Sequence, residues 1–107
     1  MKVIKDGHKY IMSNFENKEN GQTIQFIEKE LIENESLPNE KVLTTINDGT
    51  TNEEVLEVLI DRMKHLQNKF ACRENAIVIT KLEESLMWLE KRTQDRKKRN
   101  VEGKQLA

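Results

Sequence analysis

The sequence contains very few of the residues that mark disulfide scaffolds, metal sites and membrane spans. Its 107 residues include one cysteine, one proline, one tryptophan and one tyrosine. The single cysteine, Cys72, cannot form a disulfide within the chain or assemble a zinc site by itself. No stretch approaches the roughly 20 apolar residues that a membrane-spanning helix needs, and residues 1–10 lack the apolar run of a signal peptide. We therefore expect a cytoplasmic protein without metal or cofactor.

Charge is abundant and nearly balanced. The chain has 18 Lys and Arg against 19 Asp and Glu, which gives a formal net charge of -1. Nucleic-acid binders are usually basic overall, so this balance argues against one, although residues 92–99 are strongly basic. A domain of this length buries only about two-thirds of its unfolded surface, so association between copies would add useful burial. We expect a single domain over residues 1–107.

The first residues predict a short β-hairpin. Val3–Met12 has β-forming residues on both sides of Asp6-Gly7, which is a strong two-residue turn signal. The polar residues 13–21 that follow have the composition of a loop. Phe15 is the large apolar residue of this loop, and we expect it to point inward.

Two further strands are expected before residue 47. Thr23–Lys29 alternates apolar and polar residues and is predicted to form one strand, with Ile24 and Phe26 on the same face. Residues 33–40 are predicted to form a loop or hairpin tip. Lys41–Ile46 is rich in β-branched residues and is predicted to return to the sheet as a strand.

Residues 51–54, Thr-Asn-Glu-Glu, predict the start of a first helix. The Thr51 hydroxyl can accept a hydrogen bond from an early N–H of the helix while Glu54 reaches back, which is a capping box. The helix is expected to run to about Lys69, with an apolar stripe at helical spacing. The stripe consists of Val55, Leu59, Met63, Leu66 and Phe70, and is widened by Leu56 and Ile60.

A second helix follows a tight connection at residues 70–73. Because a short link makes two helices antiparallel neighbours, a helical hairpin is expected. Its second helix has leucines and an isoleucine three and four residues apart, as in a coiled-coil seam: Ile79, Leu82, Leu86 and Leu89. Other apolar residues lie off this seam, namely Ala76, Ile77, Met87 and Trp88. We infer from them a subunit interface.

The fold class predicted is therefore α+β, with an oligomeric assembly. A small N-terminal antiparallel β-sheet occupies residues 1–47 and a C-terminal antiparallel two-helix hairpin occupies residues 51–99. Residues 100–107 form a tail. No catalytic constellation is present, since His8 and His65 lie on different elements and neither has a nucleophile beside it.

Binding chemistry is what the residues can support. Guanidinium groups bind phosphate oxygens through paired hydrogen bonds. The candidate phosphate ligands are Arg62, Arg73, Arg92 and Arg96. The competing interpretation is a set of solvated charges. Aromatic rings could stack on a base, and the candidates are Phe15, Phe26, Phe70 and Trp88. Core packing is the interpretation favoured for each of these rings.

Residues 73–92 resemble the helical hairpin shared by two phage protein families that sequester nucleotide signals. These are the Thoeris anti-defence sponge and the anti-CBASS cyclic-nucleotide sponge. The residues that carry the resemblance are Arg73, Ala76, Ile77, Thr80, Leu82, Glu83, Met87 and Trp88. Residues 19–26, 48–67 and 100–104 resemble the Thoeris sponge specifically, whereas residues 31–45 have no counterpart that we can identify.

The resemblance implies a protein that is not an enzyme. It implies binding and sequestration of glycocyclic ADP-ribose, the signal made by a Thoeris TIR-domain protein in the cytoplasm of an infected bacterial host. Cyclic di- and trinucleotides are further candidate ligands. The family's ligand sites lie between subunits of a dimer or a hexamer, and the sequence leaves open which of these forms here.

The resemblance also implies site residues. Arg62 is expected to bind phosphate, while Phe70 and Asn75 supply a base wall and a hydrogen bond. Arg73 is assigned to a cyclic-trinucleotide site. The complete set of ligand residues expected is Glu16, Asn20, Gln22, Gln25, Arg62, Phe70, Asn75, Arg92, Val101, Glu102 and Gly103.

Two other functions remain open at this point. A helical-hairpin module that joins copies of itself or binds a protein partner would use the same apolar surfaces. A nucleic-acid binder would use residues 92–99, and its binding would depend steeply on salt. The near-neutral charge makes the nucleic-acid binder the least favoured of the three.

Overall fold

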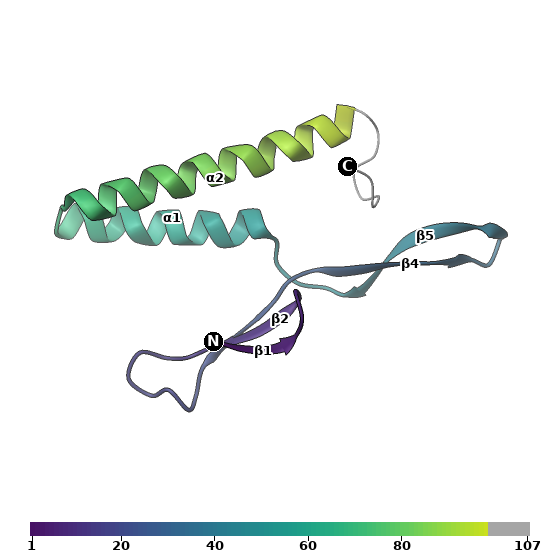
Figure 1. Cartoon of the computed structure of the whole chain (residues 1–107), viewed down its shortest axis with the longest axis horizontal. Coiled ribbons are helices and arrows are strands. Elements are labelled where there is room, and N and C mark those ends of the chain that lie inside the picture. Colours follow the sequence, from purple (N-terminus) through teal and green to yellow (C-terminus); the bar gives the residue numbers. More distant parts are fainter. Residues whose placement is uncertain (99–107) are drawn as a thin grey trace. The chain divides into compact units, whose positions relative to one another are not determined.

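The computed structural model describes residues 1–98, without the side chains of residues 37 and 38. The chain divides into two compact units, Met1–Thr51 and a second that begins at Asn52. The first unit contains only strands and loops, and the second contains two helices (Figure 1). The predicted α+β fold class is therefore confirmed. The predicted tail residues Val101, Glu102 and Gly103 lie outside the described residues.

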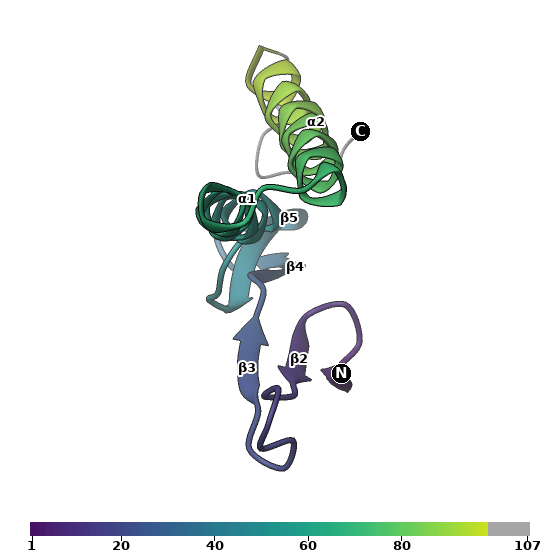
Figure 2. The ribbon, with the colours of Figure 1, turned by 90° about the vertical axis from the view of Figure 1, so that its left-hand side faces the viewer.

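A three-stranded antiparallel sheet opens the first unit. It consists of β1 (Lys2–Lys5), β2 (Lys9–Met12) and β3 (Gln22–Gln25) in the order β1-β2-β3. Figure 2 shows β3 beside β2. The predicted hairpin is present, but its turn has three residues, because Lys5 pairs with Lys9. Within that turn Gly7 has a φ of 75°, a left-handed conformation that glycine adopts without steric cost.

A separate two-stranded ribbon follows. It pairs β4 (Glu28–Asn34) with β5 (Leu37–Asn47), so that Leu31 faces Leu43 and Ile32 faces Val42. The prediction of a single strand over residues 23–29 was wrong, because this segment is divided between β3 and β4. The hairpin tip predicted within residues 33–40 is confirmed, and β5 extends beyond the predicted strand at both ends.

Backbone contacts with Thr50 explain where the strand is interrupted. The Thr50 N–H donates to the Gln25 carbonyl at 2.8 Å, and the Ile27 N–H donates to the Thr50 carbonyl at 2.9 Å. The chain leaving β5 therefore pairs with the residues between β3 and β4. Gly49 permits this close approach, because a Cβ there would lie 2.7 Å from the carbonyl carbon of Phe26.

A buried carboxylate ties the start of β4 to two other strands. Glu28 is only 3% exposed. Its carboxylate accepts hydrogen bonds from Lys5 Nζ at 2.5 Å and from Asn47 Nδ2 at 3.0 Å. The Lys5 ammonium lowers the pKa of Glu28 below its ordinary value, and the Asn47 amide lowers it further by a smaller amount. Glu28 therefore joins the end of β1 to the ends of the ribbon.

The second unit is the predicted antiparallel helical hairpin, formed by α1 (Asn52–Lys69) and α2 (Arg73–Lys98) (Figures 1 and 2). The α2 seam is confirmed, since Ile79, Leu82, Leu86 and Leu89 are all half-buried. On α1 the most buried residue is Ile60, which is 8% exposed, whereas Leu59 is 42% exposed. The predicted α1 stripe is therefore largely confirmed, because Val55, Leu56, Met63 and Leu66 are half-buried and Ile60 is buried, and only Leu59 and Phe70 of its residues are exposed.

The aromatic residues do not follow the core-packing interpretation. Phe26 packs edge-to-face on Tyr10, with ring centroids 6.1 Å apart. In contrast, Phe15 is 94% exposed, Phe70 is 82% exposed and Trp88 is 61% exposed. Core packing was thus the wrong interpretation for these three, and Phe15 does not point inward. Aromatic rings of this size usually bury most of their area, so their exposure marks surfaces that can receive a ligand or a partner.

Candidate functional site

The glutamines predicted to bind ligand lie at the two ends of β3. Successive side chains of a strand point to opposite faces, so Gln22 and Gln25 leave the sheet on different sides. The Gln25 side-chain amide donates to the Phe26 carbonyl at 2.7 Å and, more weakly, to the His8 carbonyl at 3.4 Å. Gln25 therefore stabilises the sheet, and Gln22 is the glutamine open to solvent.

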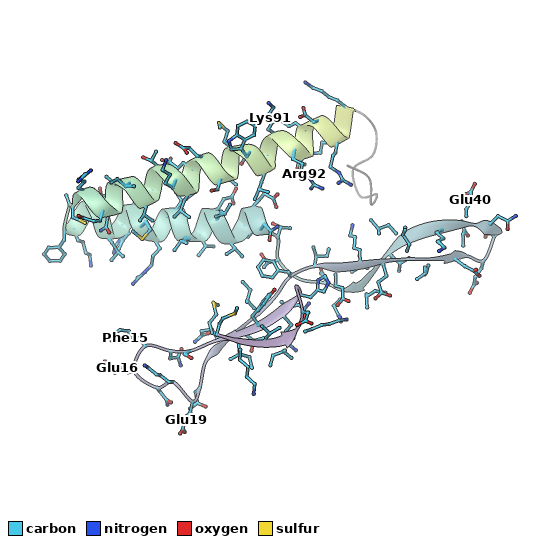
Figure 3. The ribbon with its side chains drawn as sticks, in the orientation of Figure 1. Phe15, Glu16, Glu19, Glu40, Lys91 and Arg92 are labelled. Carbon is cyan, nitrogen blue, oxygen red and sulfur yellow. The ribbon has the colours of Figure 1, made fainter. Side chains whose placement is uncertain are left out.

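The other predicted residues of the first unit lie in the loop between β2 and β3. Asn14 holds this loop together, because its amide nitrogen donates to the Asn20 carbonyl and its amide oxygen accepts from Gln22 Nε2 at 3.1 Å. Glu16 and Asn20 are both exposed. Phe15, Glu16 and Glu19 all extend outward from this loop (Figure 3). The loop therefore offers an exposed ring and carboxylates beside the amide of Gln22.

The turn between α1 and α2 is closed by side-chain hydrogen bonds. Gln67 Nε2 donates to the Cys72 carbonyl and Gln67 Oε1 accepts from the Cys72 N–H, both at 3.0 Å. Cys72 also caps α2, since the Asn75 N–H donates to its Sγ at 3.4 Å and the Ala76 N–H to its carbonyl at 3.2 Å. Phe70 is held in this turn with its ring in solvent.

Arg62 and Arg73 are both exposed on the hairpin. Arg62 lies two residues after the buried Ile60, and a two-residue step turns about 200° around a helix. Arg62 therefore points away from α2. Arg73 is the first residue of α2, where backbone N–H groups and the helix dipole also favour an anion.

Arg92, the last predicted site residue within residues 1–98, lies near the other end of α2 in a shallow pocket of about 250 Å³. Trp88, Lys91 and Asp95 line this pocket with it. The Lys91 ammonium lies over the indole ring of Trp88, 5.0 Å from the ring centroid. Figure 3 labels Lys91 and Arg92 on α2. Sequence reasoning missed Lys91 and Asp95, although their spacing from Trp88 on one helical surface could have revealed them.

The predicted residues of the helical unit therefore fall into separate groups. Phe70, Arg73 and Asn75 surround the turn, whereas Arg92 lies 17 residues beyond Asn75. At 1.5 Å per residue this separation is about 25 Å along α2, which is too far for one compact cyclised nucleotide to contact both groups in one chain. Arg96 was a further candidate, but it is 9% exposed and so presents little surface to a ligand.

The described residues contain no group of three or more His, Cys, Asp and Glu side chains arranged to hold a metal ion. Neither described helix is both long enough and apolar enough to cross a membrane. The features that residues 1–98 do offer are exposed arginines, exposed aromatic rings and side-chain amides. These groups suit phosphate, base and ribose contacts, respectively.

The fold defines a class of small α+β proteins in which a helical hairpin follows antiparallel strands. Within this class, residues 24–94 match the family described as Acb2/Tad1, hairpin domain, and the chain belongs to this family. It is similar to Thoeris anti-defense 1 of Bacillus phage SBSphiJ7, with 55% identity over 56 residues. That similarity covers 51% of this chain and 39% of the phage protein, so the chain matches less than half of its relative's length.

Proposed function

We propose that this protein is a phage anti-defence protein that counters Thoeris by binding its nucleotide signal without cleaving it. The signal is glycocyclic ADP-ribose, and its removal leaves the downstream effector inactive. The observation that carries this proposal is the 55% identity to a phage protein named Thoeris anti-defense 1. Membership of the Acb2/Tad1 hairpin family supports it from a longer stretch of the chain.

The chemistry of the exposed residues is consistent with such a ligand. A cyclised ADP-ribose carries two phosphates, ribose hydroxyls and an adenine base. Arg62 would bind a phosphate, and Phe70 and Asn75 would contact the base from the turn. From the first unit, Glu16, Asn20, Gln22 and Gln25 were expected to contact the signal. Of these, Gln25 has its amide hydrogen bonds in use within the sheet, so the other three are the stronger candidates.

A ligand site shared between subunits would allow the two separated groups of predicted residues on the hairpin to contact the same ligand. Arg92 and the turn residues of the same chain are about 25 Å apart along α2, but a second copy can bring its Arg92 to the first copy's turn. Exposed apolar side chains on α2 support association, since Ile77 is 45% exposed and Met87 is 54% exposed. We propose a dimer or hexamer, with Arg73 at a separate cyclic-trinucleotide site.

The test is calorimetric titration with glycocyclic ADP-ribose, followed by heating and chromatography of the released ligand. Tight binding and recovery of intact ligand are expected. A ligand that binds only the native state adds RT ln(1 + [L]/Kd) to stability, which is about 2.7 kcal/mol at 100 times Kd. Recovery of only ADP-ribose or AMP would indicate a hydrolase and overturn the sequestration proposal.

A second candidate function follows from the exposed apolar residues of α2. A hairpin that binds a protein partner would bury Ile77, Met87 and Trp88 and would need no nucleotide. It predicts no thermal shift with glycocyclic ADP-ribose or with cyclic di- and trinucleotides, and a single stoichiometric protein partner in pull-downs. The calorimetric titration therefore separates the two functions.

A further inference from the structure

The α2 pocket combines three chemical features on one side of a helix. Among residues 1–98, those that line it are Trp88, Lys91, Arg92 and Asp95, at intervals of three, one and three residues. Residues three and four apart on a helix are surface neighbours, so the four side chains meet over two turns. All four of these described residues belong to α2.

Trp88 gives the pocket an accessible aromatic surface. The residue is 61% exposed, although an indole gains substantially from burial. The Lys91 ammonium lies over one face of the indole, 5.0 Å from the ring centroid, and the exposure of the residue leaves other indole surface accessible to a partner. A flat base can stack on such a face, and this kind of contact tolerates any base.

The charged residues around the ring match the other parts of a nucleotide. Lys91 and Arg92 place an ammonium and a guanidinium beside the indole, where they can bind phosphate oxygens. Asp95 can accept hydrogen bonds from ribose hydroxyls or from an exocyclic amino group. Within residues 1–98, Asp95 has no ion pair that would occupy its carboxylate. The volume of about 250 Å³ suits one nucleotide unit.

We propose that this pocket binds the adenine nucleotide portion of the sequestered signal, with the base stacked on Trp88 and phosphate held by Lys91 and Arg92 of one copy, while the turn of a second copy supplies Phe70 and Asn75. The inference rests on the proposed function and adds three residues to it, Trp88, Lys91 and Asp95. It also gives Arg92 a defined role, which is phosphate binding beside a stacked base.

The chain itself supplies a reporter for this pocket, because Trp88 is its only tryptophan. Intrinsic fluorescence excited selectively at tryptophan therefore reports Trp88 alone. Titration of glycocyclic ADP-ribose is expected to quench this emission, with the same Kd as calorimetry gives. The protein concentration is held fixed while ligand is added, and the quenching should saturate. Gel filtration should show the same assembly before and after the titration.

Matched variants test the stacking by calorimetry. Trp88→Ala is expected to raise Kd at least about fivefold, while Trp88→Phe, which keeps an aromatic face, raises it less. Lys91→Gln should also weaken binding while keeping most of the side-chain length. Glu90→Ala is the control, since Glu90 is exposed, lies two residues from Trp88 and is not among the described residues that line the pocket. If Trp88→Ala fails to fold, the affinities of Lys91→Gln and Trp88→Phe still test whether the pocket binds the ligand.

The outcomes separate this inference from the function on which it rests. If the wild-type chain binds the signal but its emission and the Trp88→Ala affinity do not change, the pocket is not the nucleotide site and sequestration stands. If the wild-type chain does not bind the signal at all, the proposed function fails and the pocket assignment fails with it. An emission that shifts only with protein dilution would assign Trp88 to a contact between copies and overturn the pocket assignment.

Discussion

The side-chain amide of Gln67 and the backbone of Cys72 exchange two hydrogen bonds, each of 3.0 Å, across the turn between α1 and α2. The Gln67 side chain thus bridges the three-residue link between the helices by satisfying both the N–H and the carbonyl of Cys72. This arrangement fixes the antiparallel return of α2, and it holds Phe70 and Asn75 where the proposed ligand contacts lie. The turn is therefore where stability and binding can be tested separately.

Gln67→Ala should destabilise the hairpin by about 1–2 kcal/mol, because both hydrogen bonds are lost and each contributes about 1 kcal/mol. Gln67→Glu should have a smaller effect, since a carboxylate can still accept from the Cys72 N–H but cannot donate to the Cys72 carbonyl. Urea unfolding followed by far-ultraviolet circular dichroism measures both. Asn68→Ala, at the adjacent exposed position, is the control and should stay within about 0.5 kcal/mol of wild type.

Glu28 should make the first unit sensitive to acid. Its folded-state pKa is lowered by Lys5 and Asn47. The contribution of the Glu28 carboxylate to the free energy of unfolding is therefore fully present at pH values above its ordinary pKa of 4.5, and it is lost as the pH falls through the folded-state pKa. Glu28→Gln is expected to lower the melting temperature at pH 7 and to make it fall less between pH 4.5 and pH 3. Glu30→Gln, an exposed change on the same strand, is the control. Equal losses in wild type and Glu28→Gln on acidification would contradict this role.

Two glycine substitutions should lower the free energy of unfolding by different amounts, because one strains the backbone and the other causes a steric clash. Gly7→Ala places a side chain at a φ of 75° with open space around it, and should cost about 1–2 kcal/mol of conformational strain. Gly49→Ala should cost more, because its Cβ would lie 2.7 Å from the carbonyl carbon of Phe26 and would force the Thr50 pairing apart. Chemical denaturation measures both. Gly7→Asn is the control for strain, since asparagine tolerates the left-handed region.

Arg62→Ala should weaken binding of glycocyclic ADP-ribose by about 1.5–3 kcal/mol, if the guanidinium binds a phosphate as proposed. Titration calorimetry measures the change, and gel filtration shows whether assembly is retained. Lys69→Ala removes a positive charge from the same outward side of α1, two turns away, and is the matched control. Unchanged affinity in Arg62→Ala with intact assembly would remove Arg62 from the site.

The helical hairpin was the part that local sequence predicted well. The capping pattern at residues 51–54 and the leucine spacing of the second helix act over a few residues, and both are reflected in the structure. Phe70 was misplaced because it continues the apolar spacing of α1, while the chain has already turned at that point. An apolar period cannot indicate where a helix stops without a further signal.

The β-rich unit was predicted less accurately because its decisive contact is distant in sequence. Residues 23–29 alternate without a proline or glycine, so nothing local predicts the interruption after Gln25. The interruption comes from Thr50, whose hydrogen bonds to Gln25 and Ile27 form only once β5 has returned. The α2 pocket escaped prediction for a different reason, since Trp88 was considered alone and Lys91 was not considered, while their pairing depends on helical geometry.

The β4–β5 ribbon has a consequence for how concentrated this protein can become. Two paired strands leave two edges with unpaired backbone groups, and Leu31, Ile32 and Val42 are each more than 40% exposed. Such edges invite aggregation unless charges interrupt them, as Glu33 and Lys41 do on facing positions of the ribbon. Under the sequestration proposed above, binding sites must be at least as numerous as signal molecules, so the concentration at which the ribbon begins to aggregate would limit the amount of signal that could be removed.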